Sequence, residues 1–263
     1  MIKTCIITGA SSGIGRATAI KMLSEGYKVY DLSRHDASTA GIKHIDCDVT
    51  DDESVKAAIA NVVSEEGNID ILINSAGIAV SGAVEFTAED TANRQFDVNF
   101  WGMVRMNNAV IPVMRKQNSG KILNISSVAA QYSLPFQAYY SASKAAINSY
   151  SMAVANELRP FGVQMCAIQP GDIASNITAS RNKSIMGDDV YNGRISKNLS
   201  RIEKDETTGQ TPESAARAIA KIAAKKTMKP IYTISFSYKL LCFIGRFLPG
   251  KAINKILYSM YAK

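Results

Sequence analysis

Residues 3–23 read KTCIITGASSGIGRATAIKML, a short β-branched run followed by a glycine-rich turn and a helical stretch. The run at residues 3–8 has the composition of a buried strand. Gly9, Gly13 and Gly15 then mark a tight turn, and apolar residues at helical spacing follow. A strand that passes through such a turn directly into a helix is typical of the first unit of a parallel α/β sheet.

Strand and helix alternate along the rest of the chain. Short apolar runs predict further strands at residues 28–33, 42–45, 69–75, 121–126, 163–169 and, with a weaker pattern, 231–234. Apolar spacings of three and four predict helices at residues 14–25, 52–66, 88–117, 141–158 and 212–226. This alternation predicts a doubly wound parallel sheet with helices on both faces, a Rossmann-type α/β fold. We expect it to form a single domain over residues 1–235.

The composition is that of a globular chain of 263 residues, with 46% hydrophobic and 20% charged side chains. The four cysteines form no CxxC pair and only two histidines occur, so neither a disulfide framework nor a metal site is expected. The first residues lack the long apolar core of a signal peptide, and no run reaches about 18 apolar residues. We therefore expect a cytoplasmic protein.

The net charge of +7 is concentrated at one end of the chain. Residues 1–213 carry 20 basic and 23 acidic side chains, whereas residues 214–263 carry ten basic side chains and no acidic ones. The basic region lacks the motifs with which proteins read nucleic acids, so no nucleic-acid partner is expected.

The glycine-rich turn predicts a dinucleotide cofactor. Its glycines allow the backbone to approach a pyrophosphate, and the N-terminus of the following helix faces that anion. The residues expected to contact the cofactor here are Gly9, Ser11, Ser12, Gly13, Ile14 and Gly15. At the end of the second strand, an acidic residue favours NAD and an arginine favours NADP. Asp31 lies within the strand, whereas Ser33 and Arg34 lie at its end, so the pattern favours NADP(H).

Seven motifs in a fixed order carry a family resemblance. They are TGASSGIG (8–15), CDVTD (47–51), NSAG (74–77), DVNFWG with Asn99, NISSVA with Ser127, YSASK with Tyr140 and Lys144, and PG (170–171). Through them the chain resembles the short-chain dehydrogenase/reductase family over residues 1–235. The resemblance implies that Asn99, Ser127, Tyr140 and Lys144 are catalytic, with Asn99 orienting a water that links Lys144 to solvent. It also implies a homodimer or homotetramer.

The spacing of Tyr140 and Lys144 has a chemical reason of its own. Residues four apart share one face of a helix. A phenol with a pKa of about 10 is a poor general acid–base at neutral pH, and a nearby ammonium group would lower that pKa. Ser127, at the end of the preceding strand, would stabilise negative charge on the substrate oxygen. Two neighbours are weaker candidates, because Tyr139 has no lysine four residues later and Ser126 faces the other way along a strand.

The family resemblance implies further cofactor contacts. They are Asp48 and Val49 at the adenine, Asn74, Ala76 and Gly77 along the adenosine ribose, Tyr140 and Lys144 at the nicotinamide ribose, and Pro170, Gly171, Ile173 and Ser175 beyond them. Ser75 stands where the family more often has asparagine, a mild departure that leaves the cofactor prediction intact.

Residues 176–210 are expected to form a lid over the substrate. The segment is polar and weakly periodic, and long segments of this kind within a compact domain are usually functional. Met186, Tyr191 and Ile195 are candidates either for pocket walls or for internal contacts of a short lid helix. Tyr132 is likewise a candidate for the pocket wall or for an ordinary surface position.

Residues 236–263 predict a basic, amphipathic, helical C-terminal extension. Its apolar stripe consists of Ile253, Ile256, Leu257 and Met260. Such a tail can cover the substrate cleft, contact the surface of a membrane or pack against a partner subunit, and all three stay open. The tail resembles that of the hydroxysteroid and retinol dehydrogenase-like branch, which implies a bulky apolar substrate.

Together these features predict an NADP(H)-dependent oxidoreductase that transfers a hydride between nicotinamide and a carbonyl or secondary alcohol. A steroid- or lipid-directed dehydrogenase is the alternative among enzymes. A catalytically idle NADP-binding sensor or scaffold, associated with a membrane, is the alternative outside them. The complete Asn–Ser–Tyr–Lys set favours an enzyme, because a protein that only binds the cofactor needs no tuned phenol.

Overall fold

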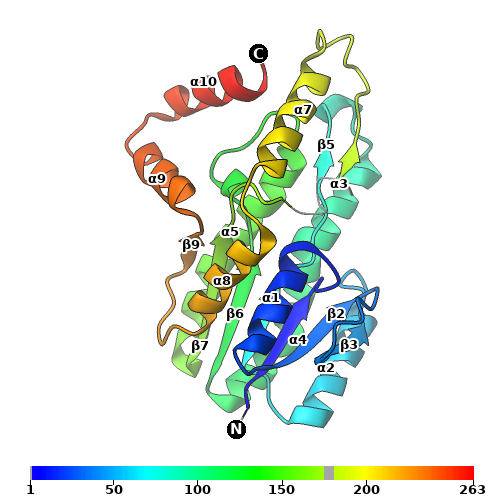
Figure 1. Ribbon diagram of the computed structural model, residues 1–263, viewed down its shortest axis with the longest axis vertical. Coiled ribbons are helices and arrows are strands. Elements are labelled where there is room, and N and C mark those ends of the chain that lie inside the picture. The colour runs from blue at the N-terminus through cyan, green and yellow to red at the C-terminus, as the bar shows by residue number, and fades with distance from the viewer. Residues whose placement is uncertain (1, 175–180) are drawn as a thin grey trace.

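The computed structural model describes residues 2–174 and 181–263, which form a layered α/β fold around one large sheet (Figure 1). The sheet has seven strands in the order β3-β2-β1-β4-β6-β7-β9, and every pairing is parallel. The strands are β1 (Thr4–Thr8), β2 (Lys28–Ser33), β3 (Ile42–Asp46), β4 (Ile71–Asn74), β6 (Gly120–Ile125), β7 (Val163–Gln169) and β9 (Ile231–Thr233). The predicted Rossmann-type fold class is confirmed.

Helices cover both faces of the sheet and bury its central strands, such as β1 and β4, on both sides. The two faces are covered by α1 (Gly13–Ser24) and α8 (Pro212–Ala223) on one side, and by α2 (Asp52–Glu66), α4 (Gly102–Gln117) and α5 (Ala138–Leu158) on the other. Successive residues of β1 show the alternation: Cys5 and Ile7 pack with α1 and α8, and Ile6 packs with α2, α4 and α5.

The strand order reverses at β1, which pairs with β2 on one edge and β4 on the other. In open α/β sheets, ligands bind in the crevice that this reversal opens at the carboxyl ends of the strands. The predicted motif residues follow β1, β2, β4, β6 and β7, so the topology gathers them at this crevice.

The helix predicted over residues 88–117 is present from Glu89 to Gln117 and contains a π-helical turn. The structure divides it into α3 (Glu89–Phe96), a π-helical turn (Asp97–Trp101) and α4. Asn99 lies within the π-helical turn, where its side-chain amide bonds both backbone groups of Ile78. The apolar periodicity predicts the helix but carries no signal for the π-helical turn within it.

The described part of the expected lid contains the short strand β8 (Asn182–Lys183), paired with β5 (Val80–Ser81), and the helix α7 (Arg194–Thr207). Ile195, Leu199 and Ile202 are buried on one face of α7. This amphipathic helix is more regular than the weak periodicity of the whole segment predicted.

The C-terminal extension forms two helices, α9 (Phe236–Gly245) and α10 (Gly250–Tyr261). Figure 1 shows them at the edge of the molecule beyond β9, with α10 near α7. In the described ranges, no helix is long and apolar enough to cross a membrane.

Candidate active site

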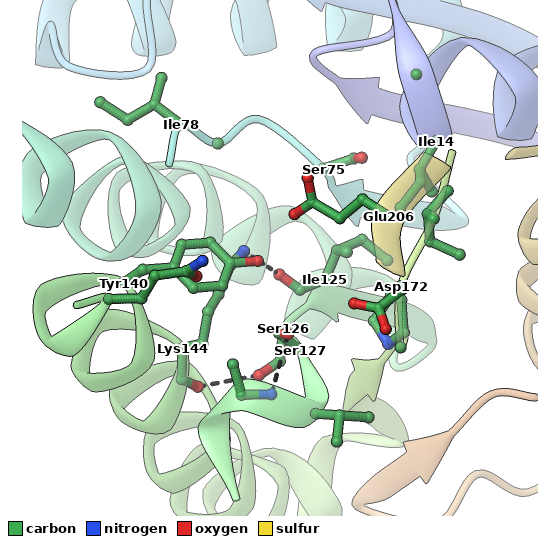
Figure 2. Close-up of a pocket in the computed structure, with 18 of the residues that line it drawn as sticks. Ile14, Ser75, Ile78, Ile125, Ser126, Ser127, Tyr140, Lys144, Asp172 and Glu206 are labelled. Atoms are coloured by element: carbon green, nitrogen blue, oxygen red, sulfur yellow. Dashed lines mark hydrogen bonds between the residues drawn. The ribbon is translucent and has the colours of Figure 1, made fainter. Parts of the chain in front are cut away.

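A cavity of about 540 Å³ opens at the carboxyl ends of the strands. One part is lined by the glycine-rich turn after β1, the ends of β2 and β4 and the residues that follow β7. The other part is lined by α7, α9 and α10. Tyr140 and Lys144, in the first turns of α5, line the cavity together with Ser127 (Figure 2).

The glycine-rich turn is built for close backbone approach. Gly9 and Gly13 have φ angles of +66° and +52°, which favour glycine. A Cβ on Gly15 would lie 2.3 Å from the carbonyl oxygen of Gly9, so no larger residue fits there. Residues 11–15 line the cavity at the N-terminus of α1, where unpaired backbone N–H groups favour an anion such as a pyrophosphate. This cradle fits a dinucleotide.

The acidic residue of β2, Asp31, has a buried side chain. The Asp31 carboxylate is buried and accepts hydrogen bonds from the backbone N–H of Ala10 (3.1 Å) and from the hydroxyl of Ser33 (2.9 Å). Asp31 therefore does not line the large cavity, whereas Ser33 and Arg34 do. The Arg34 side chain is exposed at the cavity rim. Arg94, from α3, lines the same part of the cavity and was missed by the sequence motifs.

Tyr140 and Lys144 lie next to each other in the cavity wall. The Lys144 ammonium group lies 5.7 Å from the centre of the Tyr140 ring and donates a hydrogen bond to the Ile125 carbonyl (2.9 Å). Burial lowers the pKa of Lys144 to about 8. The group therefore holds its charge at neutral pH at a cost, which is typical of a functional lysine.

The pKa of the Tyr140 phenol is raised, whereas the sequence predicted a lowered value. Burial raises its pKa, and a hydrogen bond with the Ser127 side chain opposes that rise. Burial of the phenol therefore outweighs the fall in pKa that the Lys144 ammonium group, which lies over the Tyr140 ring, was predicted to cause. A protonated Tyr140 is the form that can donate a proton.

Ser126 and Ser127 have different partners. The Ser126 hydroxyl donates to the backbone carbonyl of Lys144 (2.9 Å) and ties α5 to the end of β6. The Ser127 hydroxyl accepts a hydrogen bond from the Ala129 N–H (3.1 Å) and lines the cavity near Tyr140. Its single O–H donor is directed to the Tyr140 phenol and would turn to a substrate oxygen on binding.

Asn99 lies behind the cavity wall. Its side chain is buried, accepting from the Ile78 N–H (2.8 Å) and donating to the Ile78 carbonyl (2.9 Å). A Cβ on Gly77 would lie 3.3 Å from Asn99 Oδ1 and 3.8 Å from Lys144 Nζ, so this glycine lets the two side chains approach. Asn99 therefore holds the chain that separates it from the cavity.

The remaining predicted cofactor residues fall into three groups. Asp48, Val49, Ala76, Gly77, Pro170, Gly171 and Ile173 line the cavity. Asn74 does not, because its amide donates to the side-chain oxygens of Asn107 and Asn124 (both 2.8 Å) and links β4 to α4 and β6. Ser175 lies outside the described residues.

Three acidic side chains also line the cavity, and the motifs did not predict them. They are Asp172, which follows β7, and Asp205 and Glu206 of α7. Figure 2 shows Asp172 and Glu206 on the opposite side of the pocket from Tyr140 and Lys144. Burial raises the pKa of Asp172, and the two neighbouring carboxylates raise it further.

The C-terminal extension forms an apolar wall of the cavity. Its lining residues are Tyr238, Leu241, Ile244, Gly245, Leu248, Ile253, Ile256, Leu257, Met260 and Tyr261. Tyr238 is hydrogen-bonded to Asp172, and its ring occupies the space that a Cβ on Gly171 would need. The predicted stripe on residues 253–260 therefore faces the cavity. The sequence carried this signal but left its direction open.

Met186, Tyr191 and Ile195 do not line the cavity. Ile195 is buried against Ala83, Tyr191 packs in the same cluster, and Met186 is exposed. Ile195 and Tyr191 therefore make internal contacts of the segment, which was one of the two alternatives predicted for them. Tyr132, by contrast, lines the cavity.

Comparisons with known proteins identify the family of the chain. The family model for short chain dehydrogenases matches residues 3–185. A 3-ketodihydrosphingosine reductase of Bacteroides thetaiotaomicron is 41% identical over 224 residues, 84% of this chain and 83% of that protein. A short-chain dehydrogenase from Streptomyces avermitilis superposes with a TM-score of 0.81 at 26% identity, covering 98% of this chain and 96% of that one.

A second solved structure, ElxO with NADP bound, has a TM-score of 0.76 at 25% identity and covers 91% of this chain and 100% of that one. The family match covers the glycine-rich turn and all four predicted catalytic positions. The chain therefore belongs to the short-chain dehydrogenase/reductase family, as an oxidoreductase with a nicotinamide cofactor and a small-molecule substrate.

Proposed function

We propose that the protein is an NADPH-dependent reductase of long-chain ketones, with 3-ketodihydrosphingosine as the first candidate substrate. The main observation in support of this function is that the Tyr140 phenol and the apolar wall formed by α9 and α10 share one cavity. The 41% identity to a 3-ketodihydrosphingosine reductase supports the same substrate class.

The preference for NADPH rests on the end of β2. The 2′-phosphate of NADP needs hydrogen-bond donors and positive charge, which the exposed Arg34 guanidinium offers at the cavity rim, whereas the Ser33 hydroxyl already donates to Asp31. The 2′-hydroxyl of NAD needs an acceptor, and the candidate acceptor, Asp31, already accepts from Ala10 and Ser33. Binding of NADP by the structural neighbour ElxO supports this choice.

The chain's own residues would supply the proton and the electrostatic stabilisation for reduction. NADPH, when bound, supplies the hydride. Tyr140 donates its phenolic proton to the carbonyl oxygen of the substrate. Ser127 donates a hydrogen bond to the same oxygen and stabilises the negative charge that develops there. The Lys144 ammonium group stabilises the phenolate that remains on Tyr140.

Asn99 has a positioning role in this scheme. Its bonds to Ile78 fix the backbone beside Gly77, which passes close to the Lys144 ammonium group. A water held near this backbone would return a proton to Tyr140 through Lys144 after each turnover.

The charge of the cavity favours one kind of long-chain ketone. Glu206 is paired with Arg181 and Asp205 with Arg201, whereas Asp172 is bonded to the Tyr238 hydroxyl and has no ion-pair partner among the described residues, so Asp172 is the carboxylate that would bind a cationic group near the ketone. A long-chain base such as 3-ketodihydrosphingosine combines an ammonium group, a ketone and an alkyl chain. Its alkyl chain would lie against Leu241, Leu257 and the other apolar residues of the wall.

NADPH oxidation measured against a panel of ketones tests this function. The panel contains 3-ketodihydrosphingosine, its N-acetyl derivative, a 3-oxoacyl ester and a ketosteroid. We expect the free amine to be turned over with the highest kcat/KM. Tyr140→Phe should lower turnover by about 10²- to 10⁴-fold, because it removes the general acid.

Tyr139→Phe is the matched control and should leave turnover unchanged. A ketosteroid turned over in preference to the long-chain base would replace the proposed substrate with the steroid alternative. Tight NADPH binding without turnover of any ketone would contradict the enzyme and favour a sensor.

A further inference from the structure

The two C-terminal helices carry a second apolar surface that faces away from the cavity. Phe236, Leu240, Phe243 and Phe247 follow one another at spacings of four, three and four, which places them on one side of α9 and of the turn after it. None of them lines the cavity, and Phe236 and Phe247 are 82% and 73% exposed. The rings of Phe243 and Phe247 pack edge to face, 5.4 Å apart. We call these four residues the outer stripe.

Basic side chains accompany the outer stripe. Lys239 on α9 and Arg246, the residue after it, lie along one edge of the outer stripe, and both are exposed. On α10, Lys251 and Lys255 are exposed on the side that does not line the cavity. Residues 236–263 carry no acidic side chain at all. Large exposed apolar side chains next to unopposed cations are typical of helices that lie in the interface of an anionic membrane.

We propose that α9 and α10 dock on the surface of an anionic lipid bilayer, with the outer stripe inserted among the lipids. Insertion would remove three phenylalanine rings from water. In a molecule that binds nothing at this surface, the exposure of these rings would have no explanation. The flanking cations would meet anionic headgroups while their alkyl stems follow the apolar side chains into the interface. A second copy that docks tail to tail fits less well, because its equally basic tail would repel this one.

The position of the docking surface has a functional consequence. The inner face of the same helices forms the apolar wall of the cavity, through residues such as Leu241, Ile244 and Leu257. A lipid that leaves the bilayer at the tail would therefore meet an apolar path to Tyr140. This part rests on the proposed function, whereas membrane docking does not.

Flotation of the full-length protein with lipid vesicles tests the docking. Vesicles of phosphatidylcholine with about 30 mol % phosphatidylglycerol are compared with vesicles of phosphatidylcholine alone. We expect the wild type to float with the anionic vesicles. The double variant Phe243→Ser/Phe247→Ser should bind them at least about tenfold more weakly. Lys239→Glu/Arg246→Glu should lose binding in the same way.

A matched control removes two exposed apolar residues elsewhere. Ile20→Ser/Phe161→Ser, on α1 and in the turn before β7, should float like the wild type. Docking is overturned if the wild type does not bind anionic vesicles, or if the Phe243→Ser/Phe247→Ser variant binds as well as the wild type. It is also overturned, in favour of a second copy, if that variant fails only to dimerise in sedimentation experiments.

Turnover separates this inference from the proposed function. With a short, water-soluble ketone, the Phe243→Ser/Phe247→Ser variant should keep the wild-type rate, because neither residue lines the cavity. Loss of flotation together with wild-type turnover would locate the defect in docking. Absence of ketone turnover in a wild type that floats would contradict the proposed function and leave docking supported.

Discussion

Lys144 is a charged side chain in a buried position, and the free-energy cost of burying its charge should be measurable. Its pKa falls from 10.5 to about 8 on burial, a difference worth about 3 kcal/mol. Below pH 8 the group is charged in both states, so the full penalty opposes folding. Between pH 8 and 10.5 the folded state releases the proton first, and the penalty disappears as the pH rises.

We therefore predict that Lys144→Met raises the free energy of unfolding at pH 7 by about 1–3 kcal/mol while abolishing turnover. Urea denaturation at pH 7, and again between pH 8 and 10.5, checks this prediction. The advantage of the variant should shrink at the higher pH. Lys116→Met, at an exposed site on α4, should change stability by less than about 0.5 kcal/mol. An advantage independent of pH would rule out the burial of the charge as its cause.

Arg34 is the residue on which cofactor preference should depend. A guanidinium–phosphate hydrogen bond contributes about 1.5–3 kcal/mol, so Arg34→Ala should raise KM for NADPH by about 10- to 100-fold. The KM for NADH should change little, because NADH has no 2′-phosphate. Steady-state kinetics with both cofactors measure the ratio.

Arg16→Ala serves as the control for this prediction, since Arg16 is an exposed arginine on α1 that does not line the cavity. Equal losses with NADPH and NADH in Arg34→Ala would mean that Arg34 does not recognise the 2′-phosphate.

At the scale of elements, α9 is held against the cavity by a close contact with Tyr132. A Cβ on Gly245 would lie 1.9 Å from the Tyr132 hydroxyl oxygen, which also contacts the Leu241 carbonyl at 3.3 Å. We predict that Gly245→Ala displaces α9, increases amide hydrogen exchange over residues 236–248 and raises KM for long-chain ketones. The KM for NADPH should not change, because Gly245 lies in the wall formed by the tail.

Gly250→Ala provides a matched control, because a Cβ at that position meets no atom within 4 Å. Both variants replace glycine by alanine within the tail, so they differ only in the contact that the methyl group makes. Hydrogen exchange that rises equally in both would show that the contact with Tyr132 does not hold α9.

The elements also show which features a sequence can predict. The strands at 28–33 and 163–169 were predicted with the bounds that the structure has, because they are short apolar runs between clear turn signals. The π-helical turn at Asp97–Trp101 was not predicted, although it places Asn99 in contact with Ile78, 21 residues earlier in the sequence. Local periodicity carries no information about such a contact.

The same distinction applies to the site as a whole. The glycine-rich turn and the Tyr140–Lys144 pair are local patterns, and the sequence sufficed to find them. Asp205 and Glu206 line the cavity because α7 packs across the carboxyl ends of the strands, where they meet Asp172 from the end of β7. The tail's stripe was visible in the sequence, but which surface it meets depends on where α10 lies relative to α7. Residues that the fold brings together from distant segments cannot be found from local sequence motifs.

For the whole molecule, the tail separates cofactor binding from substrate binding. The seven-stranded sheet ends with β9, so residues 236–263 contribute no strand to it. The tail also lies outside the glycine-rich turn and the end of β2, where NADPH would bind. A chain that ends at residue 235 should therefore fold and bind NADPH.

Such a truncated chain should lose its preference for long alkyl chains. Each buried CH₂ group contributes about 0.8 kcal/mol, so the loss of contacts to two or three of them should raise KM by about tenfold or more. The kcat/KM for a short ketone should stay within about threefold of the full-length value, because Tyr140 and Ser127 keep their supports in α5 and β6. Titration with NADPH and kinetics with ketones of increasing length measure both quantities. If KM rises equally for short and long ketones, the tail supports the fold of the catalytic centre and does not hold the alkyl chain.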